Sequence, residues 1–436
     1  MRTKIVAFVI GLFLFVSFPV PLFPHSPVPP FQSALVSTTT PEGRLAVFDD
    51  AWARINERYY DQTFHGLDWA AQRTNFRTLA ANAGSSQELY SVLRRMISSL
   101  NDPHTRVFAP EEKSDWWRPR YVSVGFATAE IAGVPTVIKV DRNSAAQRAG
   151  VRAGDVIESI NGQAALALVN SRLANLTEPA GVSSRFRVFA KLFEGPGGSF
   201  VDVVWKGKYG KQKSARFQRY WQQRELGMRV HRERGEYAVI EIEAFTKSIA
   251  VAFAKDLKQK SRGARGVIID LRTNGGGDAE AMSDVASTFL SIGTSLGQFT
   301  DRAGTSFTLS THFRSLLTPQ PLTQTKLPLI VLTSERTASA AEIFVAALRD
   351  SRRATIIGAE TCGCVLAVRT RHLLPDGGLL DVSELDYETA LGHRLEGHGL
   401  KPDETIFVER NDLYAGRDRA MELALSQLGR VRVAYH

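Results

Sequence analysis

The sequence predicts a mixed α/β protein with an N-terminal helical segment and an inserted, mostly β module. Apolar residues recur at helical spacing between residues 42 and 115, and short apolar runs separated by turn residues occupy residues 119–219. Strands then alternate with helices over residues 233–436, which is typical of a sheet with helices packed on it. The composition, 44% hydrophobic and 23% charged, is ordinary for a globular protein and excludes a disordered or polytopic membrane chain. A length of 436 residues suggests two or three domains.

The first 37 residues are typical of a targeting segment. Arg2 and Lys4 precede an apolar run over residues 5–18, which is shorter than the ~20 residues that cross a bilayer but suits the core of a signal peptide. Prolines recur from Pro19 to Pro30 and form a spacer. We expect a signal peptide or N-terminal membrane anchor with a proline-rich spacer over residues 1–37. The rest would be exported: periplasmic, secreted or anchored outside the cytoplasm. A buried core helix is the alternative.

The charge and the cysteines restrict the possible partners. The net charge is +9, but the chain has no run of five basic residues and no basic stretch interleaved with aromatics. A solvated basic surface is therefore favoured over nucleic-acid binding. The only cysteines, Cys362 and Cys364, exclude a disulfide framework. On a strand their side chains would point the same way, and a bridge between them would be strained.

Two helices are predicted in the N-terminal helical region, residues 42–115. Apolar residues at helical spacing indicate one helix over residues 47–59. Ser85 and Glu88 form a capping box at the start of the other helix, and an apolar stripe follows over residues 89–100. These stripes are more typical of a core than of a ligand site.

Short strands make up the predicted β module, residues 119–219. Asn161-Gly162 is a strong signal for a tight turn inside it. The strands expected there alternate or run apolar between Gly, Asp and Asn turns; they are Val122–Ala127, Thr136–Val140, Asp155–Ile160 and Phe200–Trp205.

The last part of the chain, residues 233–436, is predicted to hold a parallel sheet. A helical pattern over Ala338–Leu348 lies between two strands, which makes a βαβ unit and implies parallel pairing. The strands expected in this part are short β-branched or apolar runs: Tyr237–Ile242, Val267–Leu271, Leu329–Thr333 and Ala354–Gly358.

Ser339 lies where a strand ends, a turn of small residues follows and a helix begins. A serine at such a turn exposes its hydroxyl, and the helix N-terminus stabilises negative charge nearby, which suits a nucleophile whose attack creates an oxyanion. A plain helix cap is the alternative. The glycines 275–277 follow another buried strand, and their N–H groups could face an oxyanion. A plain turn is the alternative there. A phosphate-binding loop is not favoured, because this motif lacks the lysine that such a loop requires.

His104 and Glu396 complete the set of candidate catalytic residues. His104 follows the end of the second helix in a polar turn, where it could act as a general base. Glu396 lies in a glycine-rich turn and could orient a histidine, although a solvated loop acid is the alternative. His393 and His398 flank Glu396 at a metal-like spacing, but this loop lacks strand or helix geometry, so no metal site is expected.

The order of these motifs resembles that of the C-terminal-processing (tail-specific) serine peptidases and their tricorn-core relatives. The resemblance extends from about residue 48 to the C-terminus, and it is specific because five short motifs occur in the family's order. It implies a crotonase/ClpP-like catalytic core over residues 233–436 and a PDZ-like domain over residues 119–219. The five motifs are Leu100–Arg106, the PDZ-like Val124–Phe126 with Ser144–Ile157, Asp270–Gly276, Thr337–Glu342, and Glu396–Gly399 with Pro402-Asp403.

The resemblance also implies the roles of single residues. Ser339 would be the nucleophile. Gly275 or Gly276, together with the N–H of Ala340, would form the oxyanion hole. The PDZ-like domain would capture extended or unfolded C-terminal tails of a polypeptide substrate by β-augmentation, and this role falls to Val124, Gly125 and Phe126.

One departure from the family pattern concerns the catalytic base. The processing peptidases carry a lysine 25 residues after the serine, and that position is Cys364 here, a thiol with little ability to accept the serine proton. The tricorn-like branch instead uses a histidine and a late glutamate, where this chain has His104 and Glu396. We therefore expect an exported serine endopeptidase without metal or organic cofactor. The alternative is a catalytically inactive homologue that binds peptides or apolar ligands. The oligomeric state stays open.

Overall fold

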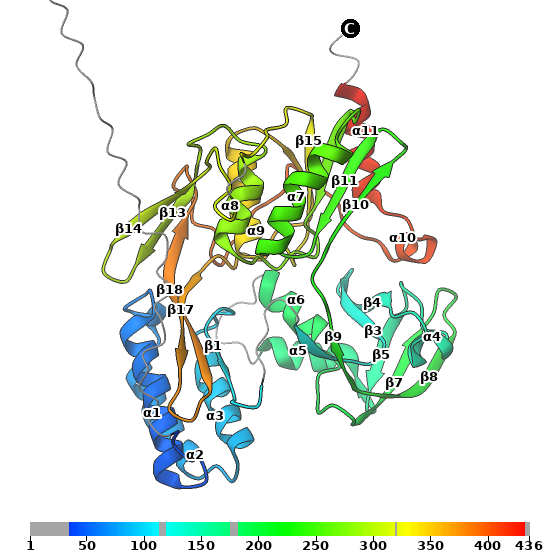
Figure 1. Ribbon diagram of the computed structural model, residues 1–436. Helices are drawn as coiled ribbons and strands as arrows, with labels where there is room; N and C mark the ends of the chain where they lie inside the picture. Colours follow the sequence, from blue (N-terminus) through cyan, green and yellow to red (C-terminus); the bar gives the residue numbers. More distant parts are fainter. Residues whose placement is uncertain (1–34, 113–118, 175–181, 319–320, 432–436) are drawn as a thin grey trace, which may run out of the picture. The chain divides into compact units, whose positions relative to one another are not determined.

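The computed structural model describes residues 35–112, 119–174, 182–318 and 321–431 (Figure 1). The expected targeting segment, including the apolar run over residues 5–18, lies outside the described residues except for its last three positions. Within the described part, none of the helices combines the length and the apolarity that crossing a bilayer requires.

The N-terminal region consists of three α-helices and one short 3₁₀ turn. The two predicted helices are present, and the Ser85 hydroxyl accepts the N–H of Glu88 at 3.1 Å as expected of a cap. A third helix, α2, was not predicted because it has no apolar stripe; only Trp69 and Ala80 of this helix are buried. The elements are α1 (Pro41–Arg58), η1 (Phe64–Gly66), α2 (Trp69–Ala81) and α3 (Ser86–Ser98).

In its described residues, the inserted module is a mostly antiparallel β structure with three helices. Asn161 and Gly162 form the expected turn between β5 and β6, with φ values of 51° and 78°. The strand expected over Val122–Ala127 is wrong: it breaks at Gly125, whose φ is +93° and where a Cβ would lie 2.8 Å from Ser144 Cβ. The elements are β2 (Arg120–Ser123), β3 (Phe126–Ile131), β4 (Val134–Val140), α4 (Ala145–Arg148), β5 (Val156–Ile160), β6 (Gln163–Ala164), α5 (Ala165–Ala174), α6 (Val182–Ala190), β7 (Phe200–Lys206), β8 (Gln212–Gln218) and β9 (Tyr220–Gln223).

A mainly parallel sheet forms the rest of the core, with strand order β10-β11-β12-β15-β16-β19. Only β10 runs antiparallel to its neighbour, and the predicted βαβ unit is confirmed, because β15 and β16 pair in parallel on either side of α9. The strands are β10 (Met228–Glu233), β11 (Tyr237–Ile242), β12 (Gly266–Asp270), β15 (Leu329–Thr333), β16 (Thr355–Gly358) and β19 (Glu404–Thr405).

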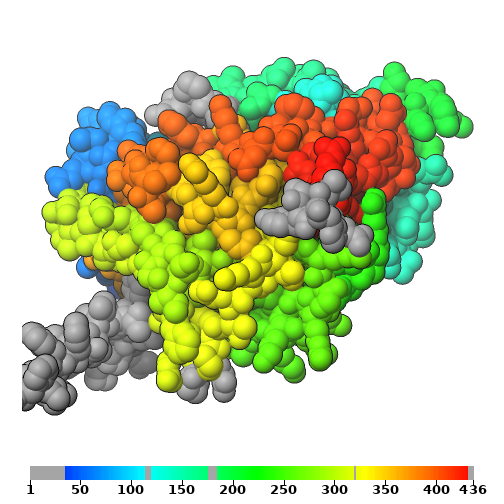
Figure 2. All heavy atoms as spheres, turned by 90° about the horizontal axis from the view of Figure 1, so that it is seen from above, coloured from blue at the N-terminus to red at the C-terminus, as the bar shows by residue number. Residues whose placement is uncertain are grey.

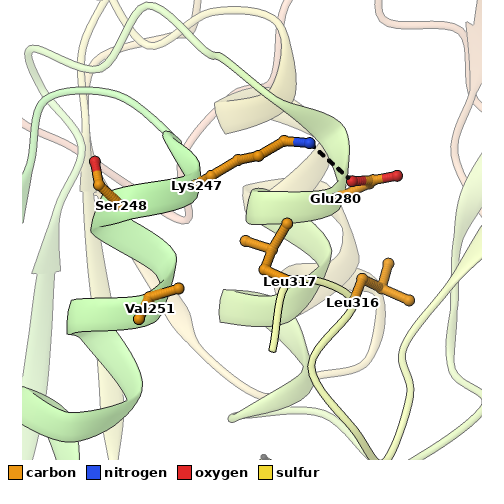
Figure 3. Close-up of a pocket in the computed structure, with 6 residues that line it drawn as sticks. All are labelled: Lys247, Ser248, Val251, Glu280, Leu316 and Leu317. Carbon is orange, nitrogen blue, oxygen red and sulfur yellow. Dashed lines mark hydrogen bonds and ion pairs between the residues drawn. The ribbon is translucent and has the colours of Figure 1, made fainter. Parts of the chain in front are cut away.

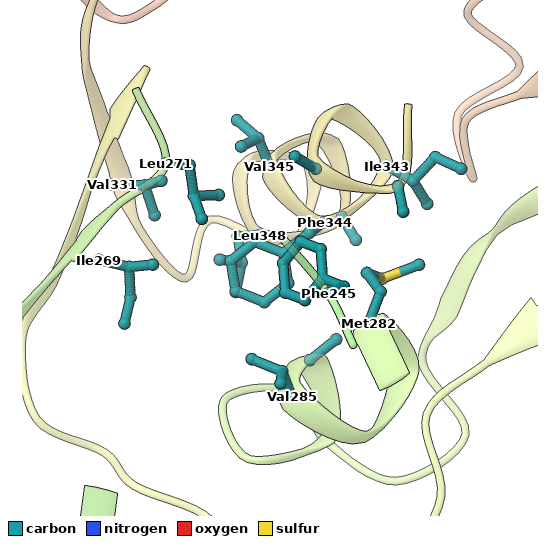
Figure 4. Close-up of a cluster of buried hydrophobic side chains, with 14 of the residues drawn as sticks. Phe245, Ile269, Leu271, Met282, Val285, Val331, Ile343, Phe344, Val345 and Leu348 are labelled. Atoms are coloured by element: carbon teal, nitrogen blue, oxygen red, sulfur yellow. The ribbon is translucent and has the colours of Figure 1, made fainter. Parts of the chain in front are cut away.

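Both faces of this sheet are covered, so successive side chains of each strand pack into two different apolar clusters, one on each face. Ile269 and Val331 face the helices α7 (Lys247–Lys260), α8 (Ala279–Ser287) and α9 (Ala340–Asp350), where Phe245 and Phe344 fill the centre (Figure 4). Ile268, one residue earlier in β12, packs against α11 (Arg419–Val431) on the opposite face. In Figure 2 the red C-terminal segment lies at the surface next to orange and yellow segments. A short helix, α10 (Arg410–Ala415), precedes α11.

A second, antiparallel sheet joins the beginning of the chain to its end and was not predicted. Strand β1 begins two residues after His104 and pairs with β18, with Arg106 opposite Asp381. This pairing connects the 102–104 turn to β18 across more than 270 residues of sequence. The strands are β1 (Arg106–Phe108), β13 (Ser295–Asp301), β14 (Ser306–Ser310), β17 (Ala367–Leu373) and β18 (Leu379–Glu388).

Candidate active site

Ser339 occupies a sharp turn between the buried strand β15 and helix α9. Its backbone has φ 56° and ψ −127°, a conformation that non-glycine residues avoid and that is characteristic of a nucleophile at a strand-to-helix turn. Two hydrogen bonds connect the turn to the residues that follow β12. The Thr337 hydroxyl donates to Leu271 O at 2.9 Å, and the Ser334 hydroxyl donates to Arg272 O at 2.7 Å. The strain at Ser339 is therefore held in place by contacts to the end of β12.

Glu342, in the first turn of α9, holds this turn together from inside the protein. Its fully buried carboxylate accepts the N–H of Ser339 at 3.1 Å and the hydroxyl of Thr361 at 2.5 Å. It also accepts the N–H groups of Gly363 and Cys364, at 2.7 and 2.9 Å. Burial raises the pKa of Glu342 to about 7, against the opposing effect of these donors. Glu342 belongs to the Thr337–Glu342 motif, but its role was not predicted.

Cys362 and Cys364 form a disulfide, a bridge for which strain was expected. The expectation assumed a strand, whereas residues 360–366 are irregular and Gly363 turns the chain with φ +69°. The Cys364 carbonyl accepts the N–H of Ser339 at 2.8 Å, so the disulfide loop contacts the candidate nucleophile directly. At the position where the resemblance calls for a lysine, the structure thus has a disulfide-bonded residue with no group that can take a proton.

The glycine loop lies against Ser339. A Cβ on Gly276, whose φ is +101°, would lie 2.6 Å from Ser339 Cβ and 3.2 Å from the nitrogen of Ala340. The structure therefore brings Gly276, Ser339 and Ala340 together. The N–H of Gly276 donates to Asn274 Oδ1 at 2.8 Å, so it is directed at a buried side chain that sequence reasoning did not single out.

His104 lies in a half-buried turn beside Asp102. The backbone N–H of His104 donates to Asp102 Oδ1 at 2.8 Å, and its ring Nδ1 lies 3.8 Å from the same oxygen. Burial lowers the pKa of the imidazole well below its usual value; Asp102 opposes this shift, and the charges of Arg106 and Arg187 add to it. His104 is therefore neutral at pH 7, as a general base must be. Arg187, from α6, was not predicted near this site.

Glu396 contacts the other side of the disulfide loop. Its carboxylate accepts the N–H groups of Val365 and Leu366 at 2.6 and 3.1 Å, and burial raises its pKa to about 8. Asp102 lies close enough to act on this pKa electrostatically. Among the residues that the structure describes, no hydrogen bond joins Glu396 to His104 or His104 to Ser339. Ser339 and Glu396 thus contact the same loop from two sides, whereas the backbone hydrogen bond and the ring contact of His104 are with Asp102.

Two of the predicted peptide-binding residues of the inserted module, Val124 and Phe126, belong to its hydrophobic core. Val124 and Phe126 are 2% and 6% exposed, and the N–H of Gly125 donates to the Ser123 hydroxyl at 2.9 Å. The Gly125 carbonyl accepts the N–H of Asp141 at 2.9 Å. The loop is thus structurally anchored, and its peptide-binding role remains a proposal.

A surface cavity of about 570 Å³ lies between α7, α8 and residues 316–317 (Figure 3). Lys247 pairs with Glu280 at 3.3 Å, and its ammonium group points away from the neighbouring Ser248. The serine and lysine of this cavity therefore do not form a dyad. Val251 contributes to the apolar part of the lining with Leu316 and Leu317.

Comparison with known protein families agrees with the motif order. Residues 236–406 match peptidase family S41, residues 41–98 match the Tricorn protease C1 domain, and residues 136–170 match a PDZ domain. The chain is 29% identical over 398 residues to a carboxyl-terminal-processing protease of Picosynechococcus sp., covering 85% of this chain and 87% of the relative. It is 28% identical over 375 residues to the chloroplastic carboxyl-terminal-processing peptidase 1 of Arabidopsis thaliana, covering 82% and 71%.

Solved structures support the fold class. A photosystem II D1 C-terminal processing protease is similar with a TM-score of 0.52 and 23% identity, covering 84% of this chain and 93% of that protein. Mature CPAF is similar with a TM-score of 0.65 and 14% identity, covering 86% and 94%. The predicted α/β core with a helical N-terminal segment and an inserted PDZ-type domain is confirmed. The chain is a serine peptidase whose residues 236–406 match peptidase family S41, and it is similar to the carboxyl-terminal-processing proteases.

Proposed function

We propose that this protein is an exported serine endopeptidase that cleaves polypeptides through an acyl-enzyme on Ser339. The observation that carries the proposal is the backbone of Ser339: φ 56° at the start of α9, with its N–H held by Glu342 and Cys364. A strained serine in a strand-to-helix turn presents its hydroxyl to a substrate. Such strain persists only where the surroundings enforce it.

In the proposed reaction, His104 takes the proton of the Ser339 hydroxyl as the oxygen attacks the scissile carbonyl. The tetrahedral oxyanion is stabilised by the N–H of Ala340 and by Gly275 or Gly276, each donor contributing about 3–4 kcal/mol. His104 then protonates the leaving amine, the peptide C–N bond breaks, and water hydrolyses the ester by the reverse sequence.

Two movements are required before this chemistry. The imidazole of His104 has to come within hydrogen-bond reach of Ser339, about 2.6–3.2 Å, which catalytic groups often attain only in the substrate complex. The N–H of Gly276 has to leave Asn274 Oδ1 if this glycine serves as the second oxyanion donor. Ala340 needs no such change, because its nitrogen belongs to the first turn of α9 beside Gly276.

Substrate capture and location extend the proposal beyond the chemistry. The inserted module would bind extended C-terminal tails along a strand edge, because PDZ domains recognise peptides by β-augmentation. Export rests on the basic, apolar and proline-rich order of residues 1–37. Relatives with names of processing proteases make an inactive binding homologue the less favoured reading.

Hydrolysis of an unfolded protein tests the proposal. Ser339→Ala should abolish cleavage, because the nucleophile is lost. Ser351→Ala, an exposed serine at the other end of the same helix, is the matched control and should cleave at the wild-type rate. Residual cleavage by purified Ser339→Ala protein at a rate near that of the wild type would reject the assignment.

A further inference from the structure

The carboxylate of Asp102 is built into the turn that carries His104. Its side chain is 2% exposed, and Oδ1 accepts the backbone N–H of His104 at 2.8 Å. Oδ2 accepts the N–H of Thr105 at 3.2 Å and its hydroxyl at 2.5 Å. The same hydroxyl accepts the N–H of Ser383 from β18 at 3.1 Å. The carboxylate is thus fixed between its own turn and the second sheet, so its position does not depend on substrate.

The imidazole of His104 is placed beside this carboxylate with one nitrogen unsatisfied. Nδ1 is buried, lies 3.8 Å from Asp102 Oδ1, and has no hydrogen-bond partner within the described part of the chain. A buried ring nitrogen without a partner is costly, and a small rotation of the ring toward Asp102 would satisfy it. The geometry therefore points to a contact that closes when the site is assembled.

Glu396, the carboxylate predicted for this role, is occupied elsewhere. One of its oxygens, Oε2, accepts both backbone N–H groups of Val365 and Leu366. Burial raises the pKa of Glu396 to about 8, which disfavours the charged form that would stabilise an imidazolium.

We propose that Asp102 is the positioning residue of His104: its carboxylate holds the proton on Nδ1, leaves Nε2 free to accept the Ser339 proton, and stabilises the imidazolium that forms. The inference rests on the proposed function, in which His104 is the base. No covalent step is added, because Asp102 exchanges no proton in this role.

Three other charged groups also shift the pKa of His104 electrostatically. They are Arg106 of β1, Arg187 of α6 and Asp381 of β18. The two arginines lower the pKa of His104, whereas Asp102 and Asp381 raise it. Removing the charge of Asp102 should therefore lower the pKa of His104 further, because less negative potential remains to favour the protonated ring.

The test compares Asp102→Asn with the wild type in steady-state cleavage over a range of pH. Asparagine keeps an oxygen for the turn and loses the charge. We expect kcat to fall by about 100-fold or more, with KM changed less than about threefold, and the acidic limb of the profile to move to lower pH. In a His104→Ala background, Asp102→Asn should cause no further loss, because a positioning residue acts only through its partner.

Three outcomes would overturn the proposal. They are wild-type kcat in Asp102→Asn, a further loss on top of His104→Ala, and a large loss in Glu396→Gln with none in Asp102→Asn. If Ser339→Ala or His104→Ala keeps activity, the proposed function fails instead, so the two failures are distinguishable.

If Asp102→Asn does not fold, the tautomer of His104 in the wild-type protein tests the proposal instead. In ¹⁵N-labelled protein, the His104 ring, assigned by its loss in His104→Gln, should carry its proton on Nδ1. A proton on Nε2 would contradict the proposal.

Discussion

At the scale of single residues, Ser339 and Gly276 depend on each other. Ser339 has a positive φ that costs about 1–3 kcal/mol for a residue with a side chain, and its Cβ lies where only a glycine leaves room. Gly276 provides this room and has a φ of +101° itself. The nucleophile turn and the glycine loop therefore form one packed unit.

Gly276→Ala should accordingly disrupt the site. The new methyl group would lie 2.6 Å from Ser339 Cβ and 2.9 Å from the carbonyl oxygen of Ala338, and backbone cannot yield cheaply there. We expect a loss of at least about 1–3 kcal/mol in the free energy of unfolding, measured in urea, together with loss of cleavage. Gly275→Ala is the comparison for stability, because its added Cβ meets nothing within 4 Å. Equal stability of the two variants would refute this account of the loop.

At the scale of elements, the disulfide loop makes structural contacts at the position where the resemblance implies a lysine. Cys362 donates its N–H to Thr337 O at 2.9 Å, and the Cys364 carbonyl accepts the N–H of Ser339. The N–H groups of Gly363 and Cys364 bind Glu342, which also holds Ser339. Four backbone contacts thus connect a three-residue loop to the nucleophile turn.

Reduction of this disulfide should impair catalysis. Opening the loop loosens its contacts to Ser339 and Glu342, and a nucleophile misplaced by about 1 Å can lose a factor of about 100 in rate. We expect dithiothreitol to lower kcat by about tenfold or more. The variant Cys362→Ser/Cys364→Ser should show the low rate from the start and no response to the reductant. A wild-type enzyme that keeps its rate after both thiols are titrated would contradict the role of the loop.

The elements that the sequence predicted are those whose signal is local. Strands β11 and β15 and helix α9 carry their apolar patterns within about ten residues, and the structure confirms them. The pairing of β1 with β18 was not predicted, because no local pattern reports a contact between distant strands. The bridge between Cys362 and Cys364 was judged from strand geometry, which this irregular segment does not have.

The site was predictable to a similar degree. The turn at Ser339 and the nearby glycines followed from a strand–turn–helix pattern and from the order of motifs. Asp102, Glu342 and Asn274 lie inside quoted motifs, but their roles depend on hydrogen bonds that only the folded chain makes. Arg187 had no signal in the sequence, because α6 carries it to the site from the inserted module.

At the scale of the whole molecule, the buried carboxyls of the site should make stability depend on pH. The pKa values of Glu342 and Glu396 are raised from 4.5 to about 7 and about 8. Each of these carboxyls therefore binds more protons in the folded chain than in the unfolded chain at any pH between 4.5 and its raised pKa. Their stabilising contribution is full below pH 4.5 and is lost as pH rises through 7 and 8. His104, whose pKa is lowered, has the opposite sign but acts only below its ordinary value of 6.5.

The free energy of unfolding should therefore fall between pH 6.5 and 8.5, where the carboxyls act alone. Urea denaturation at several pH values measures this slope. Glu396→Gln should flatten it, whereas Glu335→Gln, a change of the same kind beside the nucleophile turn, should leave it unchanged. A free energy of unfolding that rises with pH in this range, or a slope that Glu396→Gln does not alter, would show that these carboxyls are not buried as the structure has them.

The central claim is that Ser339 is an activated nucleophile despite the missing lysine. The most direct measurement is mass spectrometry of the protein after reaction with a fluorophosphonate, followed by mapping of the modified peptide. We predict one adduct per chain, located on Ser339, absent in Ser339→Ala and strongly slowed in His104→Ala. An unmodified Ser339 in folded, disulfide-bonded protein, or an adduct on another serine, would contradict the account.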